Sequence, residues 1–249
     1  DLDPLAGDVV SIVVIYTTIA ARDLAAHSMA VFRSLATGNL AEARRRVGAI
    51  VGRDPDRLDE AGVARATIES VAESTVDGVT APLMVAVIAG PVGAIVYRAI
   101  NTLDSMFGHQ DERYCRFGWA AARIDDLANF LPARCTAPLV CVAAFLLRLR
   151  PAASLRMLLR DGRKHASPNA GWTEAAMAGA LGVQLGGVNY YDGRPLEKPT
   201  LGEAIVPLCA AHIRTANAVM FVTVGLFVAI SLGLRAAVTH LWDTWGLAR

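Results

Sequence analysis

Acidic side chains recur at helical spacing in the segment ARATIESVAESTVDG, residues 64–78. Arg65, Glu69, Glu73 and Asp77 are each four residues apart, so a helix would carry them in one slowly drifting stripe. Carboxylates at this spacing repel one another by roughly a few tenths of a kcal/mol per pair, and no lysine is interleaved. Because oxygen ligands suit hard cations, the stripe could bind Mg²⁺ or a cationic group. The alternative is an ordinary solvated helix face.

A second polar cluster follows an apolar block, in the segment AINTLDSMFGH, residues 99–109. Asn101 and Asp104 are three residues apart and would share a helix face, and Ser105 and His109 are four apart. Polar atoms that lack partners are costly next to apolar surroundings, which favours a role in binding. The alternative is that these side chains cap a helix and form the turn after it.

The third cluster places two carboxylates side by side in the segment WAAARIDDLANFLPAR, residues 119–134. Arg123 and Asp126 are three residues apart, and Asp125 and Asn129 are four apart. One helix would therefore turn two acid-centred pairs outward in different directions. Either carboxylate could hold Mg²⁺ or orient an amine. The alternative is a set of ion pairs that docks this helix on its neighbours.

The fourth cluster is the segment HASPNAGW, residues 165–172. Ser167, Pro168 and Asn169 form a capped turn that would open a helix, and helix N-termini bind phosphate through their free N–H groups. The same residue types also make ordinary N-caps, so this signal alone is weak.

Uncharged blocks surround these clusters. Residues 78–97 and 215–234 hold 20 residues each without a charge, which is enough to cross a hydrocarbon core of about 30 Å as a helix. Buried core helices are the alternative. Gly90-Pro91 predicts a discontinuous or re-entrant helix in the first block. Residues 9–21 and 135–147 have 13 uncharged residues each, a length that suits re-entrant, interfacial or partly buried helices.

The sequence therefore predicts an all-α, polytopic integral membrane protein with helical cytoplasmic segments, forming one domain over residues 1–249. The basic stretch 148–170 is expected on the cytoplasmic side. The chain begins with Asp1 and shows no signal peptide, so we expect that an N-terminal segment is missing. Further expected elements are two helices around Gly38-Asn39, helices over 60–77, 116–131 and 171–191, and a Gly/Pro-rich loop over 192–202.

Composition and missing motifs narrow the function. A net charge of +1 gives no reason to expect a nucleic-acid partner. The four cysteines form no CxxC pair and read as structural thiols of a reducing compartment. The chain has no GxxxxGK[ST], GxGxxG, HExxH or GxSxG motif, so any use of ATP would not involve a Walker loop. A membrane enzyme or a transporter remains.

Four segments, in this order, closely resemble the adenosylcobinamide-phosphate synthase family of cobalamin biosynthesis (CobD/CbiB). They are IVGRDPDRLDEAGVARATIESVAESTVDGVTAPL, AINTLDSMFGH, YCRFGWAAARIDDLANFLPAR and SPNAGWTEAAMAGALGVQLGG. The resemblance covers about residues 16–207. It implies a multi-pass protein of the cell membrane that uses ATP and Mg²⁺. The reaction it implies joins adenosylcobyric acid to (R)-1-aminopropan-2-ol O-phosphate, or to ethanolamine phosphate, through an amide bond.

Three features depart from the family pattern. The initial hydrophobic segment with its GDP…HPV-like motif is absent, which agrees with the expected truncation. Pro55 follows Arg53-Asp54 where family members commonly read GRDT. Glu73-Ser74 stands where many members have Glu-Asn, so an asparagine amide cannot be essential there if this protein is active. None of these departures removes an acidic cluster.

The resemblance also suggests roles for the clusters. An amide ligase needs Mg²⁺ on the ATP phosphates, cations on the developing charge and a base for the ammonium group. The expected metal ligands are Glu69, Glu73 and Asp77, or Asp125 and Asp126. Residues expected to bind substrate or phosphate are Arg53, Asn101, Arg123, Asn129, Arg134, Ser167 and Asn169, with Asp104 helping to orient the substrate. The base is one of Asp104, Asp125, Asp126 and His109, and the sequence does not single it out.

A non-catalytic membrane sensor, regulator or cobamide-binding scaffold is the rival interpretation. Such a protein would need one binding surface, whereas this chain carries all four polar clusters, which favours the ligase. A transporter is less favoured because the acids lie at the edges of the apolar blocks. The expected partners are the corrinoid and amino-alcohol substrates, the lipid bilayer and other membrane-associated enzymes of cobamide assembly.

Overall fold

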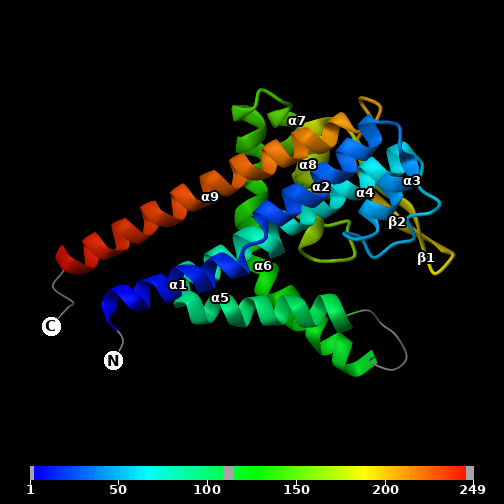
Figure 1. The fold of residues 1–249 in the computed structure, drawn as a ribbon. Coiled ribbons are helices and arrows are strands. Elements are labelled where there is room, and N and C mark those ends of the chain that lie inside the picture. Colours follow the sequence, from blue (N-terminus) through cyan, green and yellow to red (C-terminus); the bar gives the residue numbers. More distant parts are fainter. Residues whose placement is uncertain (1–2, 109–114, 245–249) are drawn as a thin grey trace.

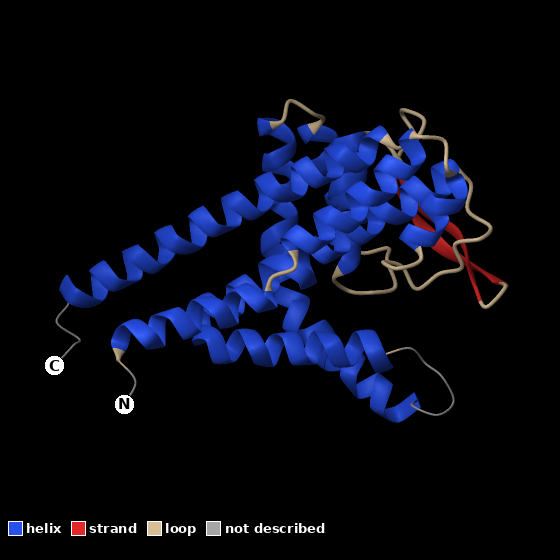
Figure 2. Ribbon diagram, in the orientation of Figure 1, coloured by secondary structure: helices blue, strands red, loops and turns tan. Residues whose placement is uncertain are grey.

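The computed structural model describes residues 3–108 and 115–244 (Figure 1). The described part is mostly helical, as Figure 2 shows, with one two-stranded sheet. In chain order the elements are α1 (Pro4–Thr18), α2 (Ala21–Ala36), α3 (Leu40–Val47), α4 (Glu60–Thr75), the π-helix η1 (Val76–Thr80), α5 (Ala81–Phe107), α6 (Cys115–Leu146), α7 (Pro151–Asp161), α8 (Ala170–Leu181), β1 (Gln184–Tyr191), β2 (Arg194–Gly202) and α9 (Ala211–Thr244).

Short polar side chains begin several of the helices. The carboxylate of Asp3 accepts a hydrogen bond from the N–H of Leu5 at 3.0 Å at the start of α1. Asn39 caps α3 in the same way, directly after the turn that was expected at Gly38-Asn39. Asp59 accepts from the N–H of Gly62 at 2.7 Å and begins α4. Each cap satisfies an N–H group that a helix terminus leaves unpaired.

Helix α4 lies at the centre of the compact part of the molecule, where it packs against α2, α8 and α9. Its residues Val63, Ile68 and Val71 are fully buried. Burying an aliphatic side chain of this size stabilises a fold by about 1.5–3 kcal/mol. The acidic stripe is therefore carried on a firmly packed helix, which holds its polar side chains in fixed positions.

Four helical stretches are long and apolar enough to cross a membrane: Pro4–Ala36, Glu60–Phe107, Arg116–Leu146 and Ala211–Leu241. Figure 1 shows that α1 and α9 extend from the compact part toward the same side, and that α5 lies beside α1. Large apolar side chains are exposed along them, for example Ile12 on α1 and Ile88 on α5. Exposed apolar surface of this extent is typical of segments that contact lipid or a partner.

The chain reverses its direction inside α5, within the apolar block of residues 78–97 where a discontinuous or re-entrant helix was expected. Gly90 has φ +67° and ψ −163°, outside the helical region, and Pro91 follows it. A Cβ added at Gly93 would lie 3.4 Å from the carbonyl oxygen of Val85, although residues eight apart in a straight helix are separated by about 12 Å. The expected break at Gly90-Pro91 is confirmed, and the chain turns back on itself there.

The helix expected over 171–191 is confirmed as far as Leu181, but residues 184–202 form a β-hairpin, so the rest of that helix and the loop expected over 192–202 are wrong. Helix α8 ends at Leu181 because Gly182 adopts a left-handed conformation with φ +71°. Strands β1 and β2 then pair antiparallel, with Tyr191 opposite Arg194. Asp192-Gly193 makes the two-residue turn, with φ of +49° and +76°. An Asp-Gly pair between two strand-forming runs is the sequence signal that indicated this hairpin.

Helix α6 joins the helix expected over 116–131 to the apolar run over 135–147, which is therefore not a separate short segment. Pro132 and Pro138 lie inside α6, and Figure 1 shows the helix changing direction midway along its length. Proline removes a backbone hydrogen bond and crowds the preceding turn, which bends a helix. The bend separates the part with Asp125 and Asp126 from the apolar part.

Candidate functional site

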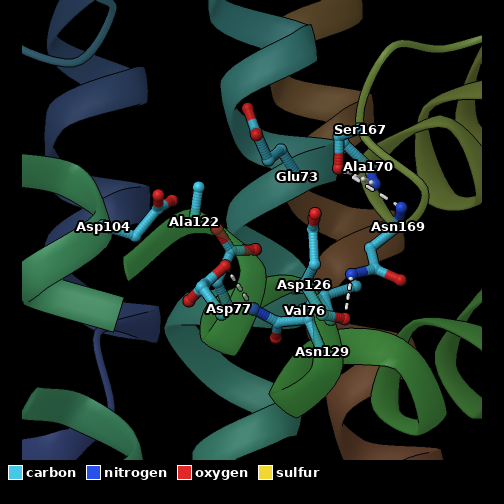
Figure 3. Close-up of a pocket in the computed structure, with 11 residues that line it drawn as sticks. Glu73, Val76, Asp77, Asp104, Ala122, Asp126, Asn129, Ser167, Asn169 and Ala170 are labelled. Atoms are coloured by element: carbon cyan, nitrogen blue, oxygen red, sulfur yellow. Dashed lines mark hydrogen bonds between the residues drawn. The ribbon is translucent and has the colours of Figure 1, made fainter. Parts of the chain in front are cut away.

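A polar cavity of about 220 Å³ lies where η1, α5, α6 and the start of α8 meet (Figure 3). Its lining includes five carboxylates and brings together members of all four polar clusters. The residues are Glu73, Val76, Asp77, Asp104, Ala122, Asp125, Asp126, Asn129, Ser167, Asn169 and Ala170. The juxtaposition of clusters far apart in the chain makes this cavity the candidate active site.

Asp125 is held by amide groups on both of its oxygens. Its Oδ1 accepts a hydrogen bond from Asn101 Nδ2 at 3.2 Å, and its Oδ2 accepts from Asn129 Nδ2 at 2.9 Å. Asn129 in turn accepts from the hydroxyl of Tyr97 at 2.7 Å, and that hydroxyl also reaches the carbonyl oxygen of Asp77 at 3.2 Å. The donors are neutral, so Asp125 is oriented rigidly without having its charge cancelled by them.

Asp126 has a different environment. Its carboxylate lies 3.4 Å from the Arg123 guanidinium, which is largely exposed. Its carbonyl oxygen accepts from Asn169 Nδ2 at 2.7 Å, and Asn169 accepts from Arg134 Nη1 at 3.1 Å. Asn169 thus fastens the loop before α8 to α6. The guanidinium of Arg134 also lies 3.5 Å from the ring centre of Phe130, so Arg134 packs at the edge of this junction.

The side chain of Ser167 caps the start of α8, as expected. Asn169 occupies the N-cap position with its backbone alone. The Oγ of Ser167 accepts from the N–H groups of Asn169 at 3.2 Å and Ala170 at 3.3 Å. The side chain of Asn169 makes no capping hydrogen bond. Both side chains line the cavity, and the phosphate-binding role expected for them stays a prediction.

A second cavity of about 640 Å³ adjoins the first and shares Glu73, Asp77 and Asp104 in its lining. It extends between α4, the loop before it and the β-hairpin. Its lining residues are Ala49, Ile50, Val51, Gly52, Arg53, Glu69, Ser70, Glu73, Ser74, Asp77, Asn101, Asp104, Ser105, His165, Glu174, Gly186, Tyr191 and Lys198. The expected substrate residue Asn101 and the expected metal ligand Glu73 therefore face one connected polar space.

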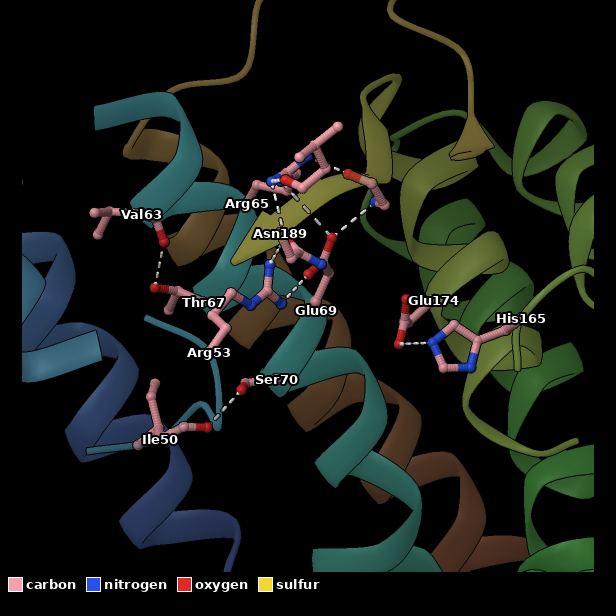
Figure 4. A network of polar contacts seen from close by, with 12 residues as sticks. Ile50, Arg53, Val63, Arg65, Thr67, Glu69, Ser70, His165, Glu174 and Asn189 are labelled. Atoms are coloured by element: carbon pink, nitrogen blue, oxygen red, sulfur yellow. Dashed lines mark hydrogen bonds and ion pairs between the residues drawn. The ribbon is translucent and has the colours of Figure 1, made fainter. Parts of the chain in front are cut away.

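Arg53 and Glu69 form a buried ion pair at the wall of the second cavity (Figure 4). The other oxygen of Glu69 accepts from the N–H of Gly186 at 2.8 Å, and Arg53 Nη1 donates to Asn189 Oδ1 at 2.7 Å. Arg65 joins the network through the carbonyl oxygen of Val188 at 2.9 Å. These contacts tie α4 to β1. The metal role expected for Glu69 and the phosphate role expected for Arg53 stay predictions, but both side chains already have strong protein partners.

Sequence reasoning gave no role to His165, although it lies in the fourth cluster, and missed Glu174 altogether; both line the second cavity. His165 Nε2 lies 3.8 Å from Glu174 Oε1, and Glu174 is only 4% exposed. Burial, reinforced by the nearby carboxylates of Glu69 and Glu73, raises the pKa of Glu174 well above its ordinary value. Burial lowers the pKa of His165. The overlooked signal was a single charged residue within the otherwise uncharged α8 sequence AGWTEAAMAGAL.

Metal binding was predicted for the carboxylates of this region. Within residues 3–108 and 115–244, no group of three or more His, Cys, Asp and Glu side chains could hold a metal ion. Mg²⁺ is commonly bound by one or two carboxylates together with water and substrate phosphates, and the carboxylate-lined cavity fits that kind of binding. His109, one of the expected bases, lies outside the described residues.

A sequence model of the CobD/CbiB protein family matches residues 2–220. The chain belongs to the CobD/CbiB family. Among curated members, the cobalamin biosynthesis protein CobD of Geobacter metallireducens is 52% identical over 218 residues, which are 88% of this chain and 69% of that protein. The CobD protein of Leptospira interrogans is 52% identical over 199 residues, covering 80% of this chain and 63% of its own length.

The CobD protein of Klebsiella pneumoniae is 44% identical over 234 residues, or 94% of this chain and 73% of that protein. The matched region thus spans about two thirds of the curated relatives' own length. No solved structure matches the chain. The family resemblance expected from the four segments is confirmed, and the cavity lies within the matched residues.

Proposed function

We propose that this protein is an enzyme of cobalamin biosynthesis that ligates adenosylcobyric acid to an amino-alcohol phosphate in an ATP-dependent reaction. The amino alcohol is (R)-1-aminopropan-2-ol O-phosphate or ethanolamine phosphate, and the product is the corresponding adenosylcobinamide phosphate. The observation that carries the proposal is the gathering of five carboxylates, two asparagines and a capped helix start around one cavity. Membership of the CobD/CbiB family supports the same pathway.

The first chemical step would activate the corrinoid carboxylate. That carboxylate attacks the γ-phosphorus of ATP, a C–O–P linkage forms, and ADP leaves. MgATP enters as a substrate, and Mg²⁺ supplies charge neutralisation of the phosphates. Asp125 is suited to orient MgATP, because Asn101 and Asn129 fix both oxygens of the Asp125 carboxylate. Five carboxylates around about 220 Å³ repel one another strongly, so a cation carried in with the nucleotide would be stabilised there.

The surroundings suit a large amphipathic substrate. The cavity is formed at the bases of helices whose outer parts expose apolar side chains, and four stretches could cross a membrane. A site at the border of a bilayer can accept a corrinoid whose faces differ in polarity. We therefore place the protein in the cell membrane as a multi-pass enzyme, next to other membrane-associated enzymes of cobamide assembly.

The test is a reconstituted ligation. The protein purified in detergent is incubated with adenosylcobyric acid, (R)-1-aminopropan-2-ol phosphate and MgATP, and the product is followed by mass. We expect the amide together with an equal amount of ADP, and no product when MgATP or the amine is omitted. Corrinoid binding without any amide would contradict the proposal and favour a regulator or scaffold.

A further inference from the structure

The second cavity is lined by a pair of titratable side chains to which the sequence analysis gave no role. His165 and Glu174 face each other there, as Figure 4 shows, and Tyr191 and Lys198 of the hairpin line the same space. Glu174 comes from the middle of α8, where every residue except Trp172 is buried. A carboxylate at such a position is costly unless it has a function or a partner.

The hydrogen bonds of His165 define its tautomer. Its Nδ1 accepts from the N–H of Ser167 at 3.0 Å, so Nδ1 carries no proton. The neutral ring therefore has its proton on Nε2, the atom that lies 3.8 Å from Glu174 Oε1. His165 is thus placed to orient the Glu174 carboxylate and cannot itself accept a proton at Nε2 while it is neutral. Of the two side chains, Glu174 is the one suited to act as the base.

The charges around Glu174 come from three elements. Glu69 and Glu73 on α4 add negative potential, and Lys198 on β2 and Arg53 in the loop before α4 oppose it. Arg53 already has Glu69 as its ion-pair partner. The region near Glu174 therefore favours a small cationic group, and Lys198 offers a positive charge for an anionic group of the same molecule.

We propose that Glu174, oriented by His165, binds the ammonium group of the amino-alcohol substrate and accepts its proton. This inference rests on the proposed ligase function and names the site of its second substrate. The cavity that contains Glu174 shares Glu73, Asp77 and Asp104 with the cavity assigned to activation, so the amine would reach the activated carboxyl group without leaving the protein. The raised pKa of Glu174 suits a proton acceptor at neutral pH.

Amide formation releases two protons from the ammonium nitrogen. Glu174 takes one proton from the ammonium group and leaves a neutral amine. The amine nitrogen attacks the acyl phosphate carbon, the C–N bond forms and the C–O bond to phosphate breaks. The second proton of the nitrogen leaves with the departing phosphate, which becomes hydrogen phosphate. The proton on Glu174 returns to solvent through the cavity.

Hydroxylamine, used in place of the amino-alcohol phosphate, distinguishes deprotonation of the amine from activation of the corrinoid carboxylate. It is mostly unprotonated at neutral pH, so it can trap an acyl phosphate as a hydroxamate without help from a base. We expect Glu174→Gln to lower amide formation from (R)-1-aminopropan-2-ol phosphate by about 100-fold at pH 7. Hydroxamate formation from adenosylcobyric acid and MgATP should stay within about twofold of the wild-type rate, which also shows that the variant is folded. The amide defect should shrink as the pH rises and more free amine is present.

Two substitutions of His165 test the orienting role. His165→Gln can keep an N–H near the position of Nε2, whereas His165→Asn keeps only an acceptor near the position of Nδ1. We expect His165→Gln to retain more amide formation than His165→Asn, with both retaining hydroxamate formation. Glu197→Gln, an exposed carboxylate on β2, is the matched control and should behave as the wild type.

The outcomes are distinguishable. If Glu174→Gln leaves both products unchanged, or lowers both equally at every pH, the inference about Glu174 is overturned while the ligase remains. If the wild-type protein forms neither amide nor hydroxamate, the proposed function fails and this inference fails with it. Loss of the amide alone, with recovery at high pH, is the result we expect.

Discussion

Glu69 and Glu73 lie one turn apart on α4, yet only Glu69 has an ion-pair partner among the described residues. Glu69 is buried with Arg53 and also accepts from the N–H of Gly186. Glu73 faces both cavities, and in the described part of the chain it has no ion pair. The first half of the acidic stripe therefore builds the fold, and the second half lines the candidate site. The difference shows that a pattern of like residues on one helix can serve two purposes.

Glu69→Ala should have the largest effect on stability. It would leave Arg53 buried without its ion-pair partner, and breaking a buried pair from one side typically costs about 3–5 kcal/mol. We expect the free energy of unfolding in detergent to fall by about that amount. Glu73→Ala is the matched comparison and should change it by less than about 1 kcal/mol. Equal losses in the two variants would remove the distinction between the halves of the stripe.

Asp125→Ala and Asp126→Ala should have the next largest effect, on ligation. We expect amide formation to fall at least about 100-fold in each variant, while unfolding shifts by only about 1–3 kcal/mol through the lost hydrogen bonds. Product mass and a denaturation curve measure the two properties on the same sample. The exposed carboxylate variant Asp56→Asn is the control and should match the wild type. Turnover like that of the wild type in both alanine variants would contradict the assignment of the Asp pair.

Asp161, a carboxylate outside the cavities, has positively charged partners, and its contribution to stability should depend on pH. Asp161 is fully buried, which by itself would raise its pKa, but hydrogen bonds from Arg160, Lys164 and the N–H of Gly202 hold the pKa well below its ordinary value. A lowered pKa stabilises the native state above the ordinary carboxyl value of about 4, and that contribution is lost as the pH falls through the native pKa.

The measurement compares the wild type with Asp161→Asn. At pH 7 we expect the variant to be less stable by about 1.5–3 kcal/mol, because charge-assisted hydrogen bonds are lost. The gap between the two unfolding curves should narrow as the pH is lowered from 5 toward 2, roughly the range below the ordinary carboxyl pKa. A gap that stays constant over this range would mean that the charge of Asp161 does not contribute.

Arg123→Gln should have the smallest effect. Its ion pair with Asp126 is 3.4 Å long and the Arg123 side chain is 63% exposed, so water screens it. Such pairs contribute about 0–1 kcal/mol. We expect the unfolding midpoint to remain unchanged within that limit, at both low and high salt. A loss as large as that of Glu69→Ala would show that the cavity wall, too, is held together by ion pairs.

Much of the architecture could be predicted from local patterns. The turn at Gly38-Asn39, the break at Gly90-Pro91 and the helix that starts near Ser167 all depend on residues adjacent in sequence. The hairpin was misjudged because small residues such as those after Gly182 suit a packed helix as well as a tight strand. Gly186 lies at an irregularity in the pairing of the two strands, where a Cβ would collide with the carbonyl oxygen of Pro199.

The candidate site was predicted less completely. Asp77, Asp104, Asp125, Asp126, Asn101 and Asn129 are brought together around the cavities as their clusters suggested. Glu174 was missed because a lone acid in a small-residue helix has no neighbour in sequence that indicates its use. Lys198 was missed because it lies on a strand of the unexpected hairpin.

The sequence by itself determined the helices, the apolar stretches, the family and the four polar clusters, because helical period, capping and composition act over a few residues. Only the tertiary structure decided which carboxylates are paired with a cation or with hydrogen-bond donors. Glu69 meets the N–H of Gly186, which is 117 residues further along the chain, whereas Glu73 opens onto the cavities. The spacing of residues on a helix fixes which way a side chain points, but its electrostatic surroundings come from distant segments that pack beside it.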